Sequence, residues 1–113
     1  MSDGSRRGGA RLMIGFHGTE PDPAFAEVLR ETGARSVILF ARNIIDADQT
    51  RELIRGIRAM VEWPLCVCVD QEGGAVARIF RGATVFCGNM ALGAAGDPGL
   101  ARRQGEASGA QLA

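Results

Sequence analysis

Three short apolar segments recur along the chain and restrict the folds that it can adopt. They are residues 12–16 (LMIGF), 36–40 (SVILF) and 65–69 (LCVCV), and their starts lie about 24 to 29 residues apart. Segments of this length rich in β-branched residues predict buried strands, and the stretches between them are long enough for a helix each. Strands joined by helical crossovers run parallel. The spacing therefore predicts an α/β fold with a parallel βαβαβ order.

The intervening stretches carry helix signals. Each predicted helix begins at an aspartate N-cap, and the first and last of these precede a proline: Asp22, Asp46 and Asp97. Gly33 predicts the C-cap of the first helix. Asp46 and Gln49 resemble a capping box that opens a second helix over residues 49–61. Residues 78–96 lack periodicity, so the full prediction is βαβαβ, a long loop and a final helix.

Composition excludes several classes of protein. The 113 residues carry 13 basic and 13 acidic side chains, so no nucleic-acid partner and no anionic membrane surface is expected. No apolar run is long enough to span a membrane. Residues 1–10, rich in Gly, Ser and Arg, are predicted to be a disordered lead-in before a domain over residues 11–113. The apolar run after them stops at His17, too short for an export signal, so the expected location is cytoplasmic.

Three cysteines fit a reducing compartment better than a disulfide framework. Cys66 and Cys68 lie two residues apart on one strand, hence on one face, where a disulfide between them would be strained. We expect them to be small buried hydrophobic residues. Because a closed zinc site needs four ligands and His17 is the sole histidine, no metal site is expected.

The turn after the third segment gathers polar residues where a strand would end. Asp70, Gln71 and Glu72 are followed by Gly73 and Gly74, which allow a sharp turn with little side-chain bulk. In α/β folds ligands bind at the carboxyl ends of parallel strands. We therefore expect Asp70 to share one face of the sheet with two other residues that follow predicted strands, His17 and Arg42.

Several of these segments together resemble a known family. SVILFARN (residues 36–43), VDQEGG (residues 69–74) with Arg78, and NMALGA (residues 89–94) with Asp97-Pro98 closely resemble the N-terminal part of glycoside hydrolase family 3. Within it they are most similar to bacterial β-N-acetylhexosaminidases. Ala75 and Cys87 depart from the residues common there, Arg and Pro. The resemblance covers residues 11–113 and implies the first three βα units of a (β/α)₈ (TIM) barrel, incomplete as given because such barrels span ~250 residues.

The resemblance also implies site residues. Asp70 and Arg78 match positions that bind the terminal N-acetylglucosamine, and their chemistry suits this: a carboxylate accepts hydrogen bonds from sugar hydroxyls and a guanidinium donates to them. The alternative is a salt bridge between them that only fixes the loop. The family uses no metal or organic cofactor, and its Lys-His motif, catalytic histidine and aspartate nucleophile lie in later loops, so no catalytic residue can be placed here.

Two other side chains could be read as catalytic. Asp70 and Glu72 could form a carboxylate pair, but on a tight turn nothing fixes the ~5 Å separation that a retaining glycosidase needs. Glu72 is expected to support the loop together with Gly73 and Gly74. His17 could be proposed as an acid/base, although the family places its histidine in a later loop.

Two functions of different class follow. The chain is the front portion of a retaining β-N-acetylglucosaminidase that releases terminal N-acetylglucosamine from cell-wall fragments in the cytoplasm. Alternatively, it is a non-catalytic, truncated or split-gene product that at most binds sugar, self-associates or joins a complementary chain. Under either hypothesis the isolated 113-residue chain is expected to be inactive.

Overall fold

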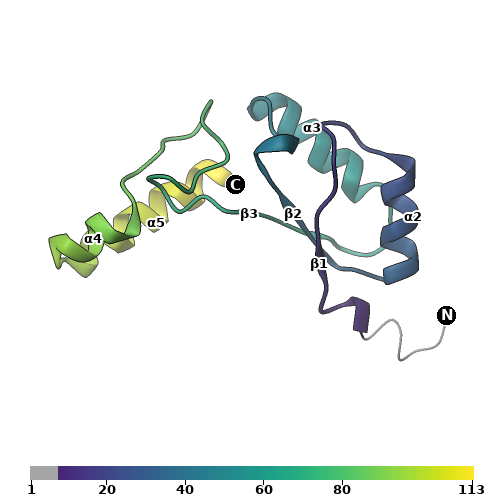
Figure 1. Cartoon of the computed structure of the whole chain (residues 1–113), viewed down its shortest axis with the longest axis horizontal. Helices are drawn as coiled ribbons and strands as arrows, with labels where there is room; N and C mark the ends of the chain where they lie inside the picture. Colours follow the sequence, from purple (N-terminus) through teal and green to yellow (C-terminus); the bar gives the residue numbers. More distant parts are fainter. Residues whose placement is uncertain (1–7) are drawn as a thin grey trace. The chain divides into compact units, whose positions relative to one another are not determined.

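The computed structural model describes residues 8–113 and divides them into two compact units, one up to Val69 and one from Asp70 to Ala113 (Figure 1). Most of the predicted lead-in, residues 1–7, lies outside the described residues. Its last part, Gly8 to Ala10, belongs to a helical turn in which the Arg11 amide donates to the Gly8 carbonyl at 3.1 Å. The buried Gly9 packs so tightly against Thr32 that a Cβ there would lie 1.9 Å from the Thr32 carbonyl oxygen.

The first unit contains a three-stranded sheet. Its strands are β1 (Met13–Ile14), β2 (Ser36–Leu39) and β3 (Cys66–Val69), in the order β1-β2-β3, and both pairings are parallel. Met13 pairs with Ser36, and Ser36 pairs with Cys66. The predicted parallel α/β order is therefore confirmed, with strands shorter than the apolar segments that predicted them.

Two capped helices connect these strands. Helix α2 (Pro23–Thr32) begins where the Asp22 carboxylate accepts from the Ala24 amide at 2.9 Å. It ends at Gly33, which adopts a left-handed conformation with φ 67°. Helix α3 (Ala47–Arg58) begins at Asp46, whose carboxylate accepts from the Gln49 amide at 2.8 Å. The predicted caps are confirmed.

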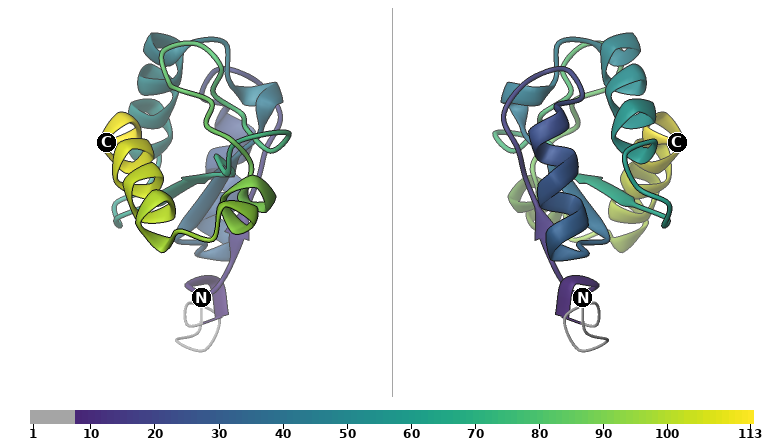
Figure 2. Two further views of the ribbon diagram at one scale, coloured as in Figure 1. Left: turned by 90° about the vertical axis from the view of Figure 1, so that its left-hand side faces the viewer. Right: turned by 90° about the vertical axis from the view of Figure 1, so that its right-hand side faces the viewer.

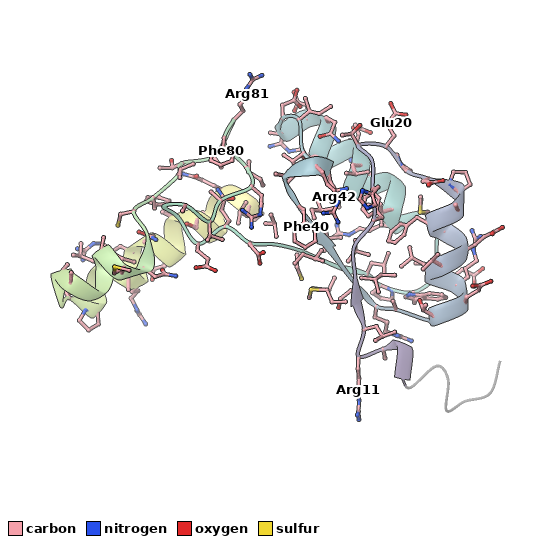
Figure 3. All side chains as sticks on the ribbon, viewed as in Figure 1. Arg11, Glu20, Phe40, Arg42, Phe80 and Arg81 are labelled. Atoms are coloured by element: carbon pink, nitrogen blue, oxygen red, sulfur yellow. The ribbon has the colours of Figure 1, made fainter. Side chains whose placement is uncertain are left out.

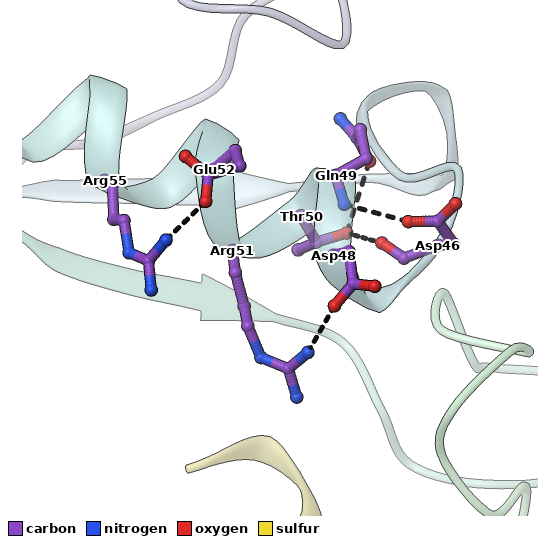
Figure 4. A network of polar contacts seen from close by, with 7 residues as sticks. All are labelled: Asp46, Asp48, Gln49, Thr50, Arg51, Glu52 and Arg55. Carbon is purple, nitrogen blue, oxygen red and sulfur yellow. Dashed lines mark hydrogen bonds and ion pairs between the residues drawn. The ribbon is translucent and has the colours of Figure 1, made fainter.

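The predicted bounds of the second helix, residues 49–61, are wrong by two or three residues at each end. The capping box is also incomplete, because the Gln49 side chain accepts from the Ile45 amide at 2.9 Å. Figure 4 shows this helix start, together with exposed ion pairs that Arg51 makes with Asp48 and Arg55 with Glu52.

One hydrophobic core joins the helices to one face of the sheet. Figure 2 shows α2 in front of the strands in its right-hand view. The rings of Phe16 and Phe25 stack with centroids 4.5 Å apart. The Trp63 indole packs against this core and donates to the Ala34 carbonyl at 3.0 Å. The buried members of the core are Phe16, Phe25, Leu29, Ala34, Val37, Leu39, Leu53, Ile57 and Leu65.

The third strand is less buried than the sequence predicts. Cys66 is exposed and Val67 to Val69 are half-buried, so the prediction of a strand buried on both faces is wrong. Among the described residues β3 pairs only with β2, and Val67 is the β3 residue that packs against the core. The prediction that Cys66 and Cys68 are buried is wrong for the same reason.

The second unit consists of a loop over residues 70–88 and two helices, α4 (Asn89–Ala95) and α5 (Pro98–Leu112). Helix α4 was not predicted, because it is short and has no buried residue to give an apolar periodicity. The predicted start of α5 is confirmed: the Asp97 carboxylate accepts from the Gly99 amide at 2.8 Å. Over residues 8–113, no helix is long and apolar enough to cross a membrane.

Candidate functional site

A buried asparagine ties together the chain after β1 and the chain after β2. Asn43 lies in a short 3-10 helix, η1 (Ala41–Asn43), and is fully buried. Its amide nitrogen donates to the carbonyls of Phe16 at 3.2 Å and Gly18 at 2.8 Å. Its side-chain oxygen accepts from the Phe40 amide at 2.9 Å. Asn43 is therefore a structural cross-link between the two strand ends.

Arg42 belongs to the same cross-link. Its Nε donates to the Phe16 carbonyl at 3.1 Å, and its guanidinium carbon lies 4.6 Å from the centre of the Phe40 ring (Figure 3). Gln49 adds further bonds, to the carbonyls of Thr19 at 2.6 Å and Asn43 at 3.0 Å. Polar residues at these two strand ends thus serve the local structure, while His17 stays exposed just after β1.

Asp70 and Arg78 are brought together in the second unit. Asp70 directly follows Val69, the last residue of β3. Its Oδ2 lies 3.9 Å from Nη2 of Arg78, and the two side chains are 44% and 25% exposed. This separation exceeds a hydrogen bond. The pair is therefore a loose one, and both groups retain capacity to bond polar atoms of a ligand.

Gln71 holds the backbone at Arg78 close to the residue that follows Asp70. Its Oε1 accepts from the backbone amides of Arg78 at 2.9 Å and Ile79 at 3.0 Å, and its Nε2 donates to the Ile79 carbonyl at 2.9 Å. One side chain thereby replaces the hydrogen bonds that a neighbouring strand would make. This role is not predictable from the sequence, because the partners are backbone groups seven and eight residues away and leave no residue pattern.

The glycine turn packs against the residues that precede α4. Gly73 has φ 95°, and a Cβ there would lie 2.5 Å from the Cys87 carbonyl oxygen. Gly74 has φ 58°, and its amide donates to the Phe86 carbonyl at 2.8 Å. A Cβ at Gly73 would clash with the backbone and one at Gly74 would lie only 3.0 Å from the Gly88 Cα, and both residues have positive φ, so the loop favours glycine at each position.

Glu72 faces a different partner from Asp70. Its carboxylate accepts from the Asn89 side-chain amide at 3.2 Å, and its backbone carbonyl accepts from Gln104 of α5 at 3.3 Å. These bonds connect the loop to both helices of the unit.

The arrangement can bind polar ligands but offers no metal cage. A carboxylate and a guanidinium on one loop can together accept from and donate to neighbouring hydroxyls. Across residues 8–113, no group of three or more His, Cys, Asp or Glu side chains is placed to hold a metal ion.

Comparison with known proteins gives consistent matches. Residues 8–113 match the model of the glycosyl hydrolase family 3 N-terminal domain. A β-hexosaminidase of Histophilus somni is 42% identical over 73 residues, which are 65% of this chain and 21% of that protein.

Solved structures agree. A family 3 β-N-acetylglucosaminidase from Paenibacillus sp. FPU-7 superposes with a TM-score of 0.87 at 35% identity, over 96% of this chain and 21% of its own. NagZ from Neisseria gonorrhoeae, solved with N-trifluoroacetyl-D-glucosamine, gives 0.60 at 29% identity over 65% and 22%.

The chain thus spans about a fifth of the length of these relatives. Its three parallel strands alternating with helices match the corresponding part of the family's barrel domain. The matched region contains the residues after β2 and the loop after β3, where the motifs found in the sequence lie. The chain belongs to glycoside hydrolase family 3.

Proposed function

We propose that this chain supplies the N-terminal, sugar-binding part of a retaining β-N-acetylhexosaminidase that removes terminal non-reducing N-acetylglucosamine from peptidoglycan-derived fragments. The observation that carries the proposal is the loose pair of Asp70 and Arg78, 3.9 Å apart and partly exposed on a loop held by Gln71. A tight salt bridge would satisfy both groups internally. At the observed separation, each side chain can instead exchange its hydrogen bonds with water for hydrogen bonds with sugar hydroxyls.

The relatives support the class of ligand. One is described as a β-N-acetylglucosaminidase and another was solved with an N-acylated glucosamine. In this proposal Asp70 accepts from two adjacent hydroxyls and Arg78 donates to one, while Glu72, Gly73 and Gly74 support the loop. The nucleophile and the acid/base belong to later parts of the barrel, so the 113-residue chain by itself binds sugar without hydrolysing it.

Binding is tested by saturation-transfer NMR with N-acetylglucosamine on the chain and on Asp70→Asn and Arg78→Gln variants. A hydrogen bond to a charged group contributes about 1.5 to 3 kcal/mol, so each variant should weaken binding roughly ten- to hundredfold. Asp48→Asn is the matched control, because Asp48 pairs with Arg51 at 2.9 Å on the exposed side of α3. Equal loss in the control, or no loss in the two loop variants, would contradict the proposal.

Catalysis is tested separately with a chromogenic N-acetylglucosaminide. The isolated chain should release no more chromophore than a buffer blank. Release that disappears in Asp70→Asn would instead place the reacting groups within these 113 residues.

A second candidate function is association with another copy or with a complementary chain. It is favoured by the strand order β1-β2-β3, in which, among residues 8–113, β1 and β3 each pair with β2 alone. Unpaired strand edges promote pairing between chains. Sedimentation velocity should then show a mass that rises with concentration. A monomer with a single cooperative unfolding transition would exclude this candidate.

A further inference from the structure

One side chain of α5 holds two separate parts of the loop over residues 70–88. Gln104 lies near the middle of this helix and is half-buried. Its Nε2 donates to the Glu72 carbonyl at 3.3 Å and to the Cys87 carbonyl at 3.2 Å. A side-chain amide nitrogen carries two hydrogens, so it can make both bonds at once. Gln104 therefore bridges the part of the loop that follows Asp70 and the part that precedes α4.

The bridge reinforces a backbone contact between the same two parts of the loop. The Gly74 amide donates to the Phe86 carbonyl at 2.8 Å, next to the two carbonyls that Gln104 binds. Within residues 8–113, the Glu72 and Cys87 carbonyls accept from Gln104 alone. Loss of this amide would therefore leave both carbonyls without a protein donor and the loop contact with only its backbone bond.

A chain of short connections leads from this bridge to Asp70 and Arg78. Glu72 follows Asp70 by two residues, and the residue between them is Gln71, whose Oε1 accepts from the Arg78 amide at 2.9 Å. A displacement of the backbone at Glu72 therefore reaches the carboxylate through one neighbour and the guanidinium through the Gln71 side chain. The donor and both acceptors of the bridge lie in the same compact unit as the pair.

We propose that Gln104 is a positioning residue for the sugar-binding pair. Its amide fastens the glycine turn to α5 and thereby keeps the Asp70 carboxylate at its 3.9 Å separation from the Arg78 guanidinium. Gln104 acts through the backbone at Glu72 and makes no contact with the sugar itself. For its effect on sugar binding, this inference rests on the proposed function.

The same helix offers a matched control seven residues further on. Gln111 also bonds the loop: its Oε1 accepts from the Thr84 amide at 2.6 Å and its Nε2 donates to the Thr84 hydroxyl at 3.0 Å. Exchange of either glutamine for glutamate adds the same charge and changes helix propensity little. A carboxylate in place of Gln111 keeps both partners, because an amide and a hydroxyl can each donate to it. A carboxylate in place of Gln104 loses both bonds, because it has no hydrogen to donate to a carbonyl.

The test makes two measurements on the 113-residue chain and on Gln104→Glu, Gln104→Lys and Gln111→Glu. The first is the hydrogen exchange of the Gly74 amide, which reports the loop without any ligand. The second is the affinity for N-acetylglucosamine by saturation-transfer NMR. Circular dichroism checks that each variant retains its helices. Gln104→Lys is the rescue variant, because its ammonium group can again donate to both carbonyls.

Gln104→Glu should speed exchange of the Gly74 amide and weaken sugar binding roughly three- to tenfold, the range expected for net loss of hydrogen bonds between neutral groups. Gln111→Glu should match the wild type in both measurements, and Gln104→Lys should return both to within about twofold of it.

Unchanged exchange in Gln104→Glu, an equal change in Gln111→Glu, or no recovery in Gln104→Lys would each overturn the inference. Faster exchange with unchanged sugar affinity would overturn it too. A wild-type chain that binds no N-acetylglucosamine would instead refute the proposed function, and the exchange measurement, which needs no sugar, would still decide whether Gln104 positions the loop.

Discussion

Replacing Asn43 with alanine should destabilise the first unit more than any other exchange of one polar side chain described above. The substitution removes three hydrogen bonds, to Phe16, Gly18 and Phe40, from a fully buried position. The Phe16 carbonyl keeps its bond from Arg42 at 3.1 Å. The Phe40 amide and the Gly18 carbonyl lose their partner.

The magnitude follows from these two groups. A buried polar group without a partner costs about 1 to 3 kcal/mol. Both bonds are only partly buried, so water can replace them in part and we expect a total loss of about 2 to 4 kcal/mol. Because a typical domain is stable by about 5 to 15 kcal/mol, such a loss shifts the unfolding midpoint measurably.

Trp63 gives the assay a local probe. It is the single tryptophan of the chain and its indole bonds the Ala34 carbonyl beside the core, so its fluorescence during urea unfolding follows the first unit. The control is Asn89→Ala, the same exchange at an exposed asparagine with one side-chain bond at 3.2 Å. If Asn43→Ala lowers the free energy of unfolding by less than about 0.5 kcal/mol, or no more than the control does, the burial argument is refuted.

Three further outcomes are expected. Gly73→Ala should lower the hydrogen-exchange protection of the Gly74 amide, because the new Cβ would lie 2.5 Å from the Cys87 carbonyl oxygen at φ 95°; equal protection would contradict this. Gly105→Ala, in open space on α5, should instead stabilise that helix by about 1 kcal/mol, measured by circular dichroism. Iodoacetamide at neutral pH should alkylate Cys68 more slowly than Cys87, because burial raises the pKa of Cys68. The difference between the two alkylation rates should become smaller as the pH rises. Equal rates at every pH would refute this expectation.

The sequence predicted those features of the fold that depend on local chemistry or on spacing. Aspartate caps such as Asp22 and Asp97 act on amides two residues away, and their helices were found. The parallel order followed from the crossover lengths. Helix α4 was not predicted, because none of its residues is buried. Strand β3 was predicted to be more buried than it is, because the composition of a strand does not reveal how many other strands pair with it.

The candidate site divides in the same way. Asp70 and Arg78 were identified through a motif, and the structure places them 3.9 Å apart. The sequence marks Asn43 only as a polar residue after a predicted strand and Gln71 only as part of a turn. Both side chains form hydrogen bonds with backbone groups, which every type of residue carries. No sequence pattern could therefore have indicated these bonds.

The bonds made by Gln71 also have a consequence for how such a loop can change in evolution. Asp70, Gln71 and Arg78 all lie within nine consecutive residues of one compact unit. The geometry of these three residues therefore depends on one continuous segment of the chain. Substitutions in the first unit can alter the strands without separating the Asp70 carboxylate from the Arg78 guanidinium. Substitutions in surrounding loops can therefore accumulate while the spacing within this stretch is retained.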